Sequence, residues 1–252
     1  RDRSVSRGLG DVYKRQVLAN SSFSLASTAM DFSKNWVAGN SSPEIIFAYV
    51  NNSRASSPLN FTLYVNDTDG SWNYAPSDWC YNSLFADDNT LSRKGDVRLK
   101  ATFTSQDANR VIKYPNGTYQ LAETSDYTCT PVVISRISEM YLIKAEALGK
   151  TNGAAALVEY MKKRYTTAPS EAAIKALSDK EYQTLILDER RREFYAEGMR
   201  WQDIKRTNRL ELLETLDGRT YLMYYPIPQD EIDMAGTVAY PQNPGYAGYT
   251  GN

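Results

Sequence analysis

The chain has 252 residues and a formal net charge of −1, and it contains no histidine. The lack of histidine excludes Ser-His-Asp and Cys-His nucleophilic mechanisms and every metal site with a histidine ligand. A charge this close to zero gives no reason to expect a nucleic acid or an anionic membrane surface as a partner. No apolar run reaches the roughly 18 residues of a membrane-spanning helix.

Residues 1–16 differ in character from the rest of the chain. They are basic, whereas the remainder is mildly acidic. The stretch resembles the translation of a sequencing adaptor joined to a gene fragment, and we expect a non-native tail here. The alternative is a natural basic tail. We therefore take residues 17–252 as the folded part, and we expect the natural protein to extend further upstream.

Two elements are predicted near the start of the folded part. Apolar residues at near-helical spacing predict a partial helix within residues 17–39. The run 43–50 is rich in β-branched and aromatic residues between polar clusters, which predicts a short strand.

The following stretch, residues 51–131, is rich in Asn, Ser, Asp, Gly and Thr. Ser77 is a suitable N-cap for a short helix over residues 76–85. A Pro-Asn-Gly turn predicts a hairpin within residues 112–121. We interpret the remainder as long ordered loops, and loops of this length inside a compact domain are commonly functional.

From residue 132 the pattern becomes helical. One apolar face predicts a helix over residues 135–149, where Gly149 is placed to end it. A short link leads to a second amphipathic helix over residues 154–165. Two helices joined by so short a turn are expected to pack antiparallel, as in a tetratricopeptide unit.

A third helix is predicted from Ser178, because Glu181 follows three residues later and completes a capping box. We expect this helix to run to about Gly198 and to be followed by a short segment over residues 201–205. The proline-rich tail after residue 218 is expected to be irregular.

Three motifs in a fixed order carry a resemblance to a known family. They are R-I-S-E-M-Y-L-I-K-A-E-A at 136–147, E-R-R-R-E-F-Y-A-E-G-M-R-W-Q-D-I-K-R at 189–206, and Y-P-I-P-Q-D-E-I at 225–232 followed by Q-N-P-G-Y at 242–246. Looser matches are S-P-E-I-I-F at 42–47 and G-D-V-R at 95–98. The chain resembles the C-terminal portion of the SusD/RagB family over residues 17–252, most strongly after residue 132.

The resemblance implies a mainly α fold of tetratricopeptide-like helical pairs with long loops and a few short strands. It implies a loop-rich, ligand-side region at 17–131 and a helical scaffold at 132–252. Members are outer-membrane lipoproteins on the cell surface of Bacteroidota-type bacteria. They capture oligosaccharides, or peptides in RagB-like cases, and pass them to a SusC-like TonB-dependent transporter. The lipid is attached to an N-terminal cysteine that this chain does not contain.

The aromatic residues of the loop region are the candidate ligand contacts. Sugar rings have apolar C–H faces that stack on aromatic planes, and neighbouring amides and carboxylates bond the hydroxyl groups. The residues predicted to bind ligand are Trp72, Asn73, Tyr74, Asp78, Trp79 and Tyr81. A part of these aromatics is expected to serve as core instead.

The same region also contains candidate residues for a metal site and for a disulfide. Asp67-Thr68-Asp69-Gly70 resembles the start of a calcium loop but lacks the later ligands, so we predict no metal and no cofactor. Cys80 and Cys129 form no CxxC motif. They form either one disulfide or two buried thiols.

A stripe of carboxylates at Glu189, Glu193 and Glu197 raises the question of catalysis. Glycoside hydrolysis needs two carboxyl groups with unequal pKa values on either side of a bond. Interleaved arginines favour ionised, paired carboxylates instead, and each exposed i,i+4 pair contributes about 0.3–0.5 kcal/mol. We therefore expect a scaffold role and a non-enzymatic protein. A carboxylate glycosidase and a protein-binding tetratricopeptide adaptor are the alternatives from other classes.

Overall fold

The computed structural model describes residues 16–36, 41–50, 75–103, 111–114, 131–213, 216–235 and 241–246. The chain separates into two compact units, Arg1–Tyr195 and Ala196–Asn252, called unit 1 and unit 2. The elements of unit 1 are α2 (Ala29–Ser33), η1 (Lys34–Trp36), β1 (Ile45–Tyr49), η5 (Cys80–Leu84), β2 (Lys94–Asp96), α3 (Val97–Thr102), β3 (Val132–Arg136), α4 (Ile137–Arg164), β4 (Tyr165–Thr167), α5 (Glu171–Ala176) and α6 (Asp179–Glu193).

The long α4 is two helices joined at Gly149, as predicted. Gly149 has φ 67° and ψ 176°, a conformation outside the helical region that glycine adopts at low cost. A Cβ on Gly153 would lie 2.2 Å from the Ala145 carbonyl oxygen, and Tyr141 donates a hydrogen bond to Glu159. In these contacts a residue farther before Gly149 meets a residue farther after it, so the two halves pack antiparallel. The predicted helical hairpin is confirmed, but the predicted link at 150–153 is wrong, because only Gly149 leaves helical geometry and residues 150–153 belong to the second half. That half ends at Arg164, since Tyr165 begins β4.

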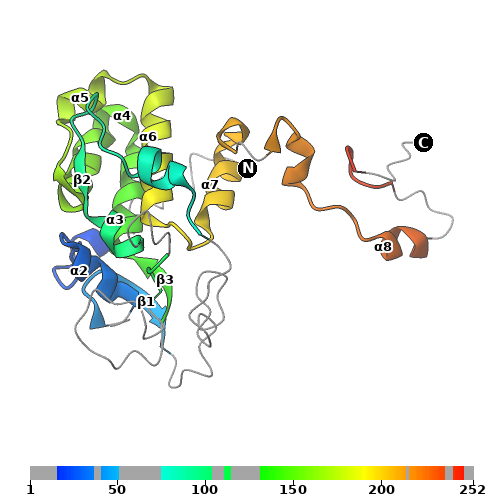
Figure 1. Cartoon of the computed structure of the whole chain (residues 1–252), viewed down its shortest axis with the longest axis horizontal. Coiled ribbons are helices and arrows are strands. Elements are labelled where there is room, and N and C mark those ends of the chain that lie inside the picture. Colours follow the sequence, from blue (N-terminus) through cyan, green and yellow to red (C-terminus); the bar gives the residue numbers. More distant parts are fainter. Residues whose placement is uncertain are drawn as a thin grey trace. The chain divides into compact units, whose positions relative to one another are not determined.

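The two halves of α4 pack against α6, and α5 packs on α4 (Figure 1). The predicted capping box begins α6: Glu181 N donates to Ser178 Oγ at 3.2 Å, and Ser178 N donates to Glu181 Oε2 at 2.7 Å. The predicted end near Gly198 is wrong, because α6 ends at Glu193. Ala196 and Gly198 both have positive φ, which a continuing helix does not accept.

Two small antiparallel sheets complete unit 1. β1 pairs with β3, with Ile45 opposite Arg136 and Tyr49 opposite Val132. The predicted strand over 43–50 is thereby confirmed. The predicted helix start at residue 135 is two residues early, because residues 132–136 extend to pair with β1 before α4 begins. β2 pairs with β4 beside the start of α3.

Three further elements were predicted within residues 17–131: a partial helix, a short helix and a hairpin. The partial helix within 17–39 is present as α2 and η1, which bury Phe32 and Trp36. The predicted short helix within 76–85 is present, because residues 78–79 are helical and residues 80–84 continue as one π-helical turn, η5. The second strand of the predicted hairpin, residues 118–121, lies outside the described residues.

Unit 2 consists of short elements. They are α7 (Met199–Thr207), η6 (Leu210–Leu212), η8 (Thr220–Met223) and α8 (Gln229–Met234). The predicted short segment at 201–205 is the centre of α7. Asn208 ends α7 in the left-handed conformation with φ 55°, and the backbone after it turns away.

The expected class is confirmed: helices in tetratricopeptide-like pairs dominate the described residues, and the strands are few and short. No helix in the described ranges combines the length and the apolar character needed to cross a bilayer. The division into a ligand-side region and a scaffold at residue 131 stays a prediction.

Candidate functional site

Eight charged side chains meet in the interior of unit 1, and we call them the buried ionic cluster. They come from segments far apart in the sequence, and each is at most 9% exposed. The cluster consists of Glu44, Asp96, Arg98, Arg136, Arg164, Glu189, Arg192 and Glu193. Four carboxylates therefore face four guanidinium groups, and two further buried cations, Arg93 and Lys113, lie at its edge, where Arg93 bonds the Tyr165 hydroxyl and Lys113 the Glu193 carbonyl.

Glu193 at the end of α6 is the centre of the cluster. Its carboxylate accepts hydrogen bonds from Arg164 Nε at 2.9 Å, Arg98 Nη1 at 3.2 Å and Tyr160 Oη at 2.6 Å. Arg136 donates to the same carboxylate and, at 2.9 Å, to the Glu193 carbonyl. One side chain thus ties α6 to α3, to β3 and to the second half of α4.

Glu189 and Glu44 extend the cluster on either side of this centre. Glu189 accepts from Arg98 at 2.9 Å, from Arg192 at 2.8 Å and from the Tyr165 hydroxyl at 2.6 Å. Glu44, which directly precedes β1, accepts from both Arg136 and Arg164. Every carboxylate oxygen of Glu189 and Glu193 has at least one charged or hydroxyl donor, which a buried carboxylate needs.

The charges of the cluster set its protonation. Burial alone would raise the pKa of Glu193, but Arg164 and Arg136 outweigh it and hold the pKa well below the ordinary value of 4.5. For Glu189, burial is likewise outweighed by Arg98 and Arg192, and its pKa is lowered. Both groups are therefore ionised at neutral pH, as predicted, and neither has the raised pKa of a general acid.

The expectation that this stripe forms exposed i,i+4 pairs is wrong for Glu189 and Glu193. Both are fully buried, and apart from the Glu189–Arg192 pair their partners come from other elements. The error arises because helical spacing describes one helix surface, whereas these side chains point into the core of the unit. Their role is to join elements, which agrees with the predicted scaffold role.

Three of the six predicted ligand contacts, Trp72, Asn73 and Tyr74, lie outside the described residues. Of the others, Asp78 is exposed and the Trp79 indole is 38% exposed. The guanidinium of Arg191 on α6 lies 4.2 Å from the centre of the Trp79 ring. The segment that leads into the π-helical turn therefore lies against α6 (Figure 1).

Tyr81 has a different environment from Trp79. Its ring packs at 5.3 Å on Phe103, which also contacts Phe85 and Tyr195. Burial, followed by the charges at Cys80 and Asp78, raises the pKa of Tyr81. Tyr81 belongs to this aromatic group within unit 1, in line with the expectation that a part of the candidates serves as core.

Cys80 is a buried free thiol next to the same aromatic group. Its Sγ lies 3.4 Å from the Tyr195 hydroxyl and 3.8 Å from Ser77 Oγ. This environment fits the buried-thiol alternative, and Cys129 lies outside the described residues.

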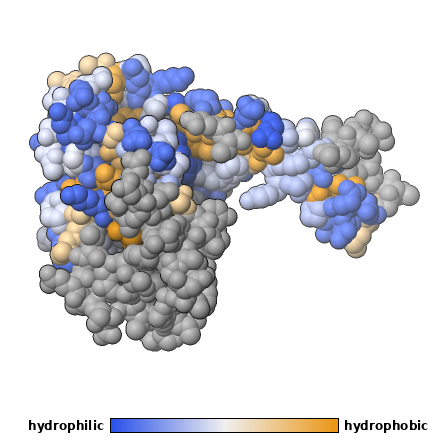
Figure 2. Space-filling model, in the orientation of Figure 1, coloured by the Kyte–Doolittle hydropathy of each residue, from blue (hydrophilic) through white to orange (hydrophobic). Residues whose placement is uncertain are grey.

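A groove of about 790 Å³ lies between α6 and the segment 88–93. Its walls include Asp188 of α6, which lies one helical turn before Arg191, the residue that contacts Trp79. Trp79 itself does not line the groove. Charged residues of both signs line it. On the face shown in Figure 2, hydrophilic side chains predominate over the described part of unit 1.

Asp67 and Asp69, which resemble the start of a calcium loop, lie outside the described residues. Within the described ranges, no group of three or more carboxylate or thiol side chains is placed to hold a metal ion.

Comparisons with known proteins extend these observations. The family model described as the SusD family matches residues 85–219. SusD-like protein P38 of Formosa agariphila is 30% identical over 142 residues, which make up 51% of this chain and 27% of that protein. The chain therefore spans about a quarter of the length of this curated relative.

Two solved structures share the fold. A SusD superfamily protein from Bacteroides fragilis has a TM-score of 0.63 and 20% identity, and the match covers 96% of this chain and 59% of that one. Surface glycan-binding protein A from Bacteroides thetaiotaomicron, in complex with laminarihexaose, has a TM-score of 0.63 and 19% identity, and the match covers 95% of this chain and 60% of that one. The family match spans most of the helical scaffold and every charged residue of α6 that belongs to the buried ionic cluster. Because of this match, we conclude that the chain belongs to the SusD family.

Proposed function

We propose that this protein binds oligosaccharide or polysaccharide nutrients at the cell surface and performs no chemistry on them. The observation that carries the proposal is the exposed indole of Trp79, with Asp78 beside it and a charged groove nearby. One structural relative is a surface glycan-binding protein in complex with laminarihexaose, which supports the same class of ligand.

The chemistry of this surface suits a sugar. Arg191 occupies one side of the Trp79 ring, so a pyranose would stack on the other side through its C–H face. The Asp78 carboxylate next to it would accept hydrogen bonds from the sugar hydroxyls. A saccharide chain continuing from this ring along α6 would reach the groove, where Asp188 and the exposed Lys180 supply a further acceptor and donor. Trp72, Asn73 and Tyr74 remain proposed contacts, whereas Tyr81 is assigned to the aromatic group of unit 1.

Replacing Trp79 by alanine is expected to weaken retardation of the protein in polyacrylamide gels that contain its polysaccharide, by about fivefold or more in apparent affinity. Wild-type protein is first run against a panel of polysaccharides to find the retarding one. Tyr225→Ala is the matched control, because Tyr225 is an aromatic residue 86% exposed in the other unit. Equal retardation of wild type and both variants would remove Trp79 from the site, and no retardation by any polysaccharide would favour the RagB-like peptide ligand.

We further propose that the partner is a SusC-like TonB-dependent transporter and that the whole protein is lipid-anchored at the outer membrane. The proposal rests on membership of the SusD family. Co-purification of the transporter with the tagged protein from detergent-solubilised outer membranes is the expected result. If the protein is recovered from those membranes without a transporter, the partnership is wrong.

The alternative of a carboxylate glycosidase has little support from the described residues. Glu189 and Glu193 are buried, ionised and bonded to arginines, so neither is available to a substrate. Release of reducing ends from the retarding polysaccharide above background would bring this alternative back.

A further inference from the structure

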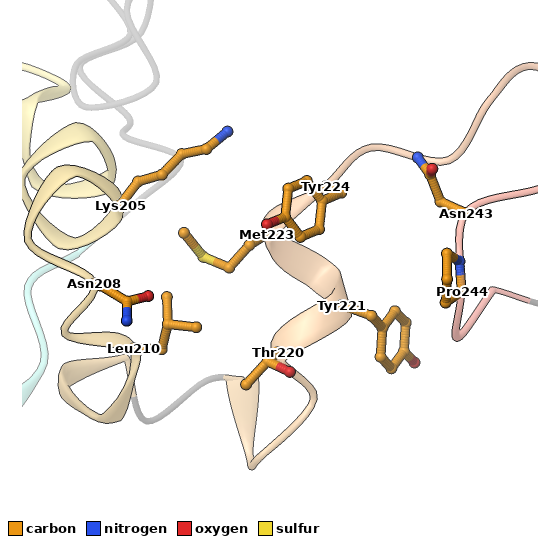
Figure 3. A pocket seen from close by; sticks show the side chains of 9 residues that line it. All are labelled: Lys205, Asn208, Leu210, Thr220, Tyr221, Met223, Tyr224, Asn243 and Pro244. Atoms are coloured by element: carbon orange, nitrogen blue, oxygen red, sulfur yellow. The ribbon is translucent and has the colours of Figure 1, made fainter. Parts of the chain in front are cut away.

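Unit 2 contains a cavity of about 460 Å³ that none of the predicted ligand residues lines. Its walls come from the end of α7, from η6, from η8 and from the Asn243-Pro244 segment of the tail (Figure 3). Cavities of roughly 300–1,000 Å³ are of the size that binds small ligands. The cavity is therefore large enough for a sugar ring.

Hydrogen bonds within unit 2 hold the tail segment in place. Gln242 donates to the Ile227 carbonyl and accepts from the Ile227 amide, both at 2.7 Å. Asn243 Nδ2 donates to the Tyr225 carbonyl at 2.8 Å, and the Tyr246 hydroxyl donates to the Tyr224 carbonyl. The motifs at 225–232 and 242–246 thus fix each other, so the tail side of the cavity is formed before a ligand arrives.

The side chains at the cavity match the chemistry of a saccharide. Tyr224 is 61% exposed and offers an aromatic ring. Asn208, Thr220 and Asn243 add amide and hydroxyl groups on different walls (Figure 3). An aromatic plane surrounded by neutral polar groups is the combination that binds the apolar face and the hydroxyl groups of a sugar.

The charge at the cavity indicates which kind of sugar it would bind. Of the described residues that line it, Lys205 alone carries a charge. Its ammonium group lies 5.7 Å from the centre of the Tyr224 ring, so the charge and the stacking surface are adjacent. A sugar stacked on Tyr224 with a carboxylate toward Lys205 would gain a charge-assisted hydrogen bond.

We infer that this cavity is a second carbohydrate site, and that it takes a uronic acid residue of an acidic glycan. The inference rests on the proposed function, because it assumes a glycan-binding protein. It differs in place and in ligand, since the Trp79 surface lies in unit 1 and this cavity favours an anionic sugar.

The test measures binding of two probes to the full chain by isothermal titration calorimetry. The probes are an oligogalacturonate and the same oligomer with its carboxylates methyl-esterified, which removes the charge and keeps the sugar rings. Wild type is expected to bind the charged oligomer more tightly than the ester. Lys205→Gln is expected to lower affinity for the charged oligomer by about fivefold and to leave binding of the ester unchanged.

Matched variants separate this site from general effects. Lys100→Gln removes an exposed charge in unit 1, and Tyr225→Ala removes the exposed neighbour of Tyr224 that does not line the cavity. Tyr224→Ala should weaken binding of both probes, and it keeps the backbone carbonyl that Tyr246 bonds.

Three outcomes decide the inference. It is supported if Lys205→Gln and Tyr224→Ala weaken binding while both control variants behave like wild type. It is overturned if each variant matches its control, or if wild type binds a neutral glycan through Trp79 but neither galacturonate probe. Failure of wild type to bind any glycan would instead overturn the proposed function on which the inference rests.

Discussion

Glu193→Gln is expected to lower the free energy of unfolding by about 3–5 kcal/mol, because it removes the central anion of a buried network and leaves guanidinium groups uncompensated. Arg98, Arg136 and Arg164 all contact this carboxylate, and all are at most 1% exposed. Glutamine has nearly the same shape, so packing is kept and the change tests charge. Urea unfolding followed by tryptophan fluorescence measures the difference.

The control is Glu171→Gln, the same substitution in an exposed ion pair. Glu171 pairs with Lys175 at 2.6 Å on α5, and both side chains are about half exposed. Such a pair contributes about 0.3–0.5 kcal/mol, so this variant should unfold almost like wild type. If the two variants lost equal stability, the cluster would not have the central role assigned to it.

The same cluster predicts a dependence on acid. The folded-state pKa values of Glu193 and Glu189 are lowered from 4.5, so these carboxylates stabilise the protein above their unfolded pKa and lose that contribution as pH falls through the folded one. The melting temperature of wild type should therefore fall steeply below about pH 4.5, and that of Glu193→Gln should fall less. Parallel curves would contradict the prediction.

Local elements could be predicted because their causes lie within a few residues. The capping box of α6 depends on Ser178 and Glu181, and the break in α4 depends on one glycine with positive φ. The strand over β1 follows from a short β-branched and aromatic run. Each feature is a short-range rule, and each is present in the structure.

The assembly of the buried ionic cluster could not be predicted in this way. Glu44 and Arg164 are 120 positions apart and meet because β1, β3 and α4 bring them together. Arg98, Arg136 and Glu193 fall in three separate motifs, and no spacing rule joins them. The sequence signal for the cluster is the number of arginine and glutamate residues in motifs whose other residues are typical of buried helices. In the candidate site, the Trp79 side chain is exposed, whereas the Tyr81 ring packs on Phe103. The difference depends on packing by residues distant in the sequence, so the local pattern does not predict it.

The helix contact at Gly153 leads to the second large prediction. In an ordinary helix interior, changing glycine to alanine stabilises a protein by up to about 1 kcal/mol. Here a Cβ would lie 2.2 Å from the Ala145 carbonyl oxygen and 2.7 Å from the Tyr182 hydroxyl. The carbonyl belongs to the backbone of the facing helix and cannot move without separating the two halves of α4.

Gly153→Ala is therefore expected to destabilise the protein by about 2–3 kcal/mol, the reverse of the usual sign, because it forces apart a close helix pair. The displaced Tyr182 hydroxyl would also lose its 2.9 Å hydrogen bond to the Ala145 carbonyl. Gly149→Ala is the comparison: a Cβ there meets nothing within 4 Å, so it reports only the backbone strain of a conformation that is nearly exclusive to glycine, about 1–3 kcal/mol. Urea unfolding of both variants decides the matter, since a Gly153→Ala variant as stable as wild type would mean that the halves of α4 do not approach this closely. Adding Tyr182→Phe should recover only part of the loss, because the contact with the Ala145 carbonyl remains.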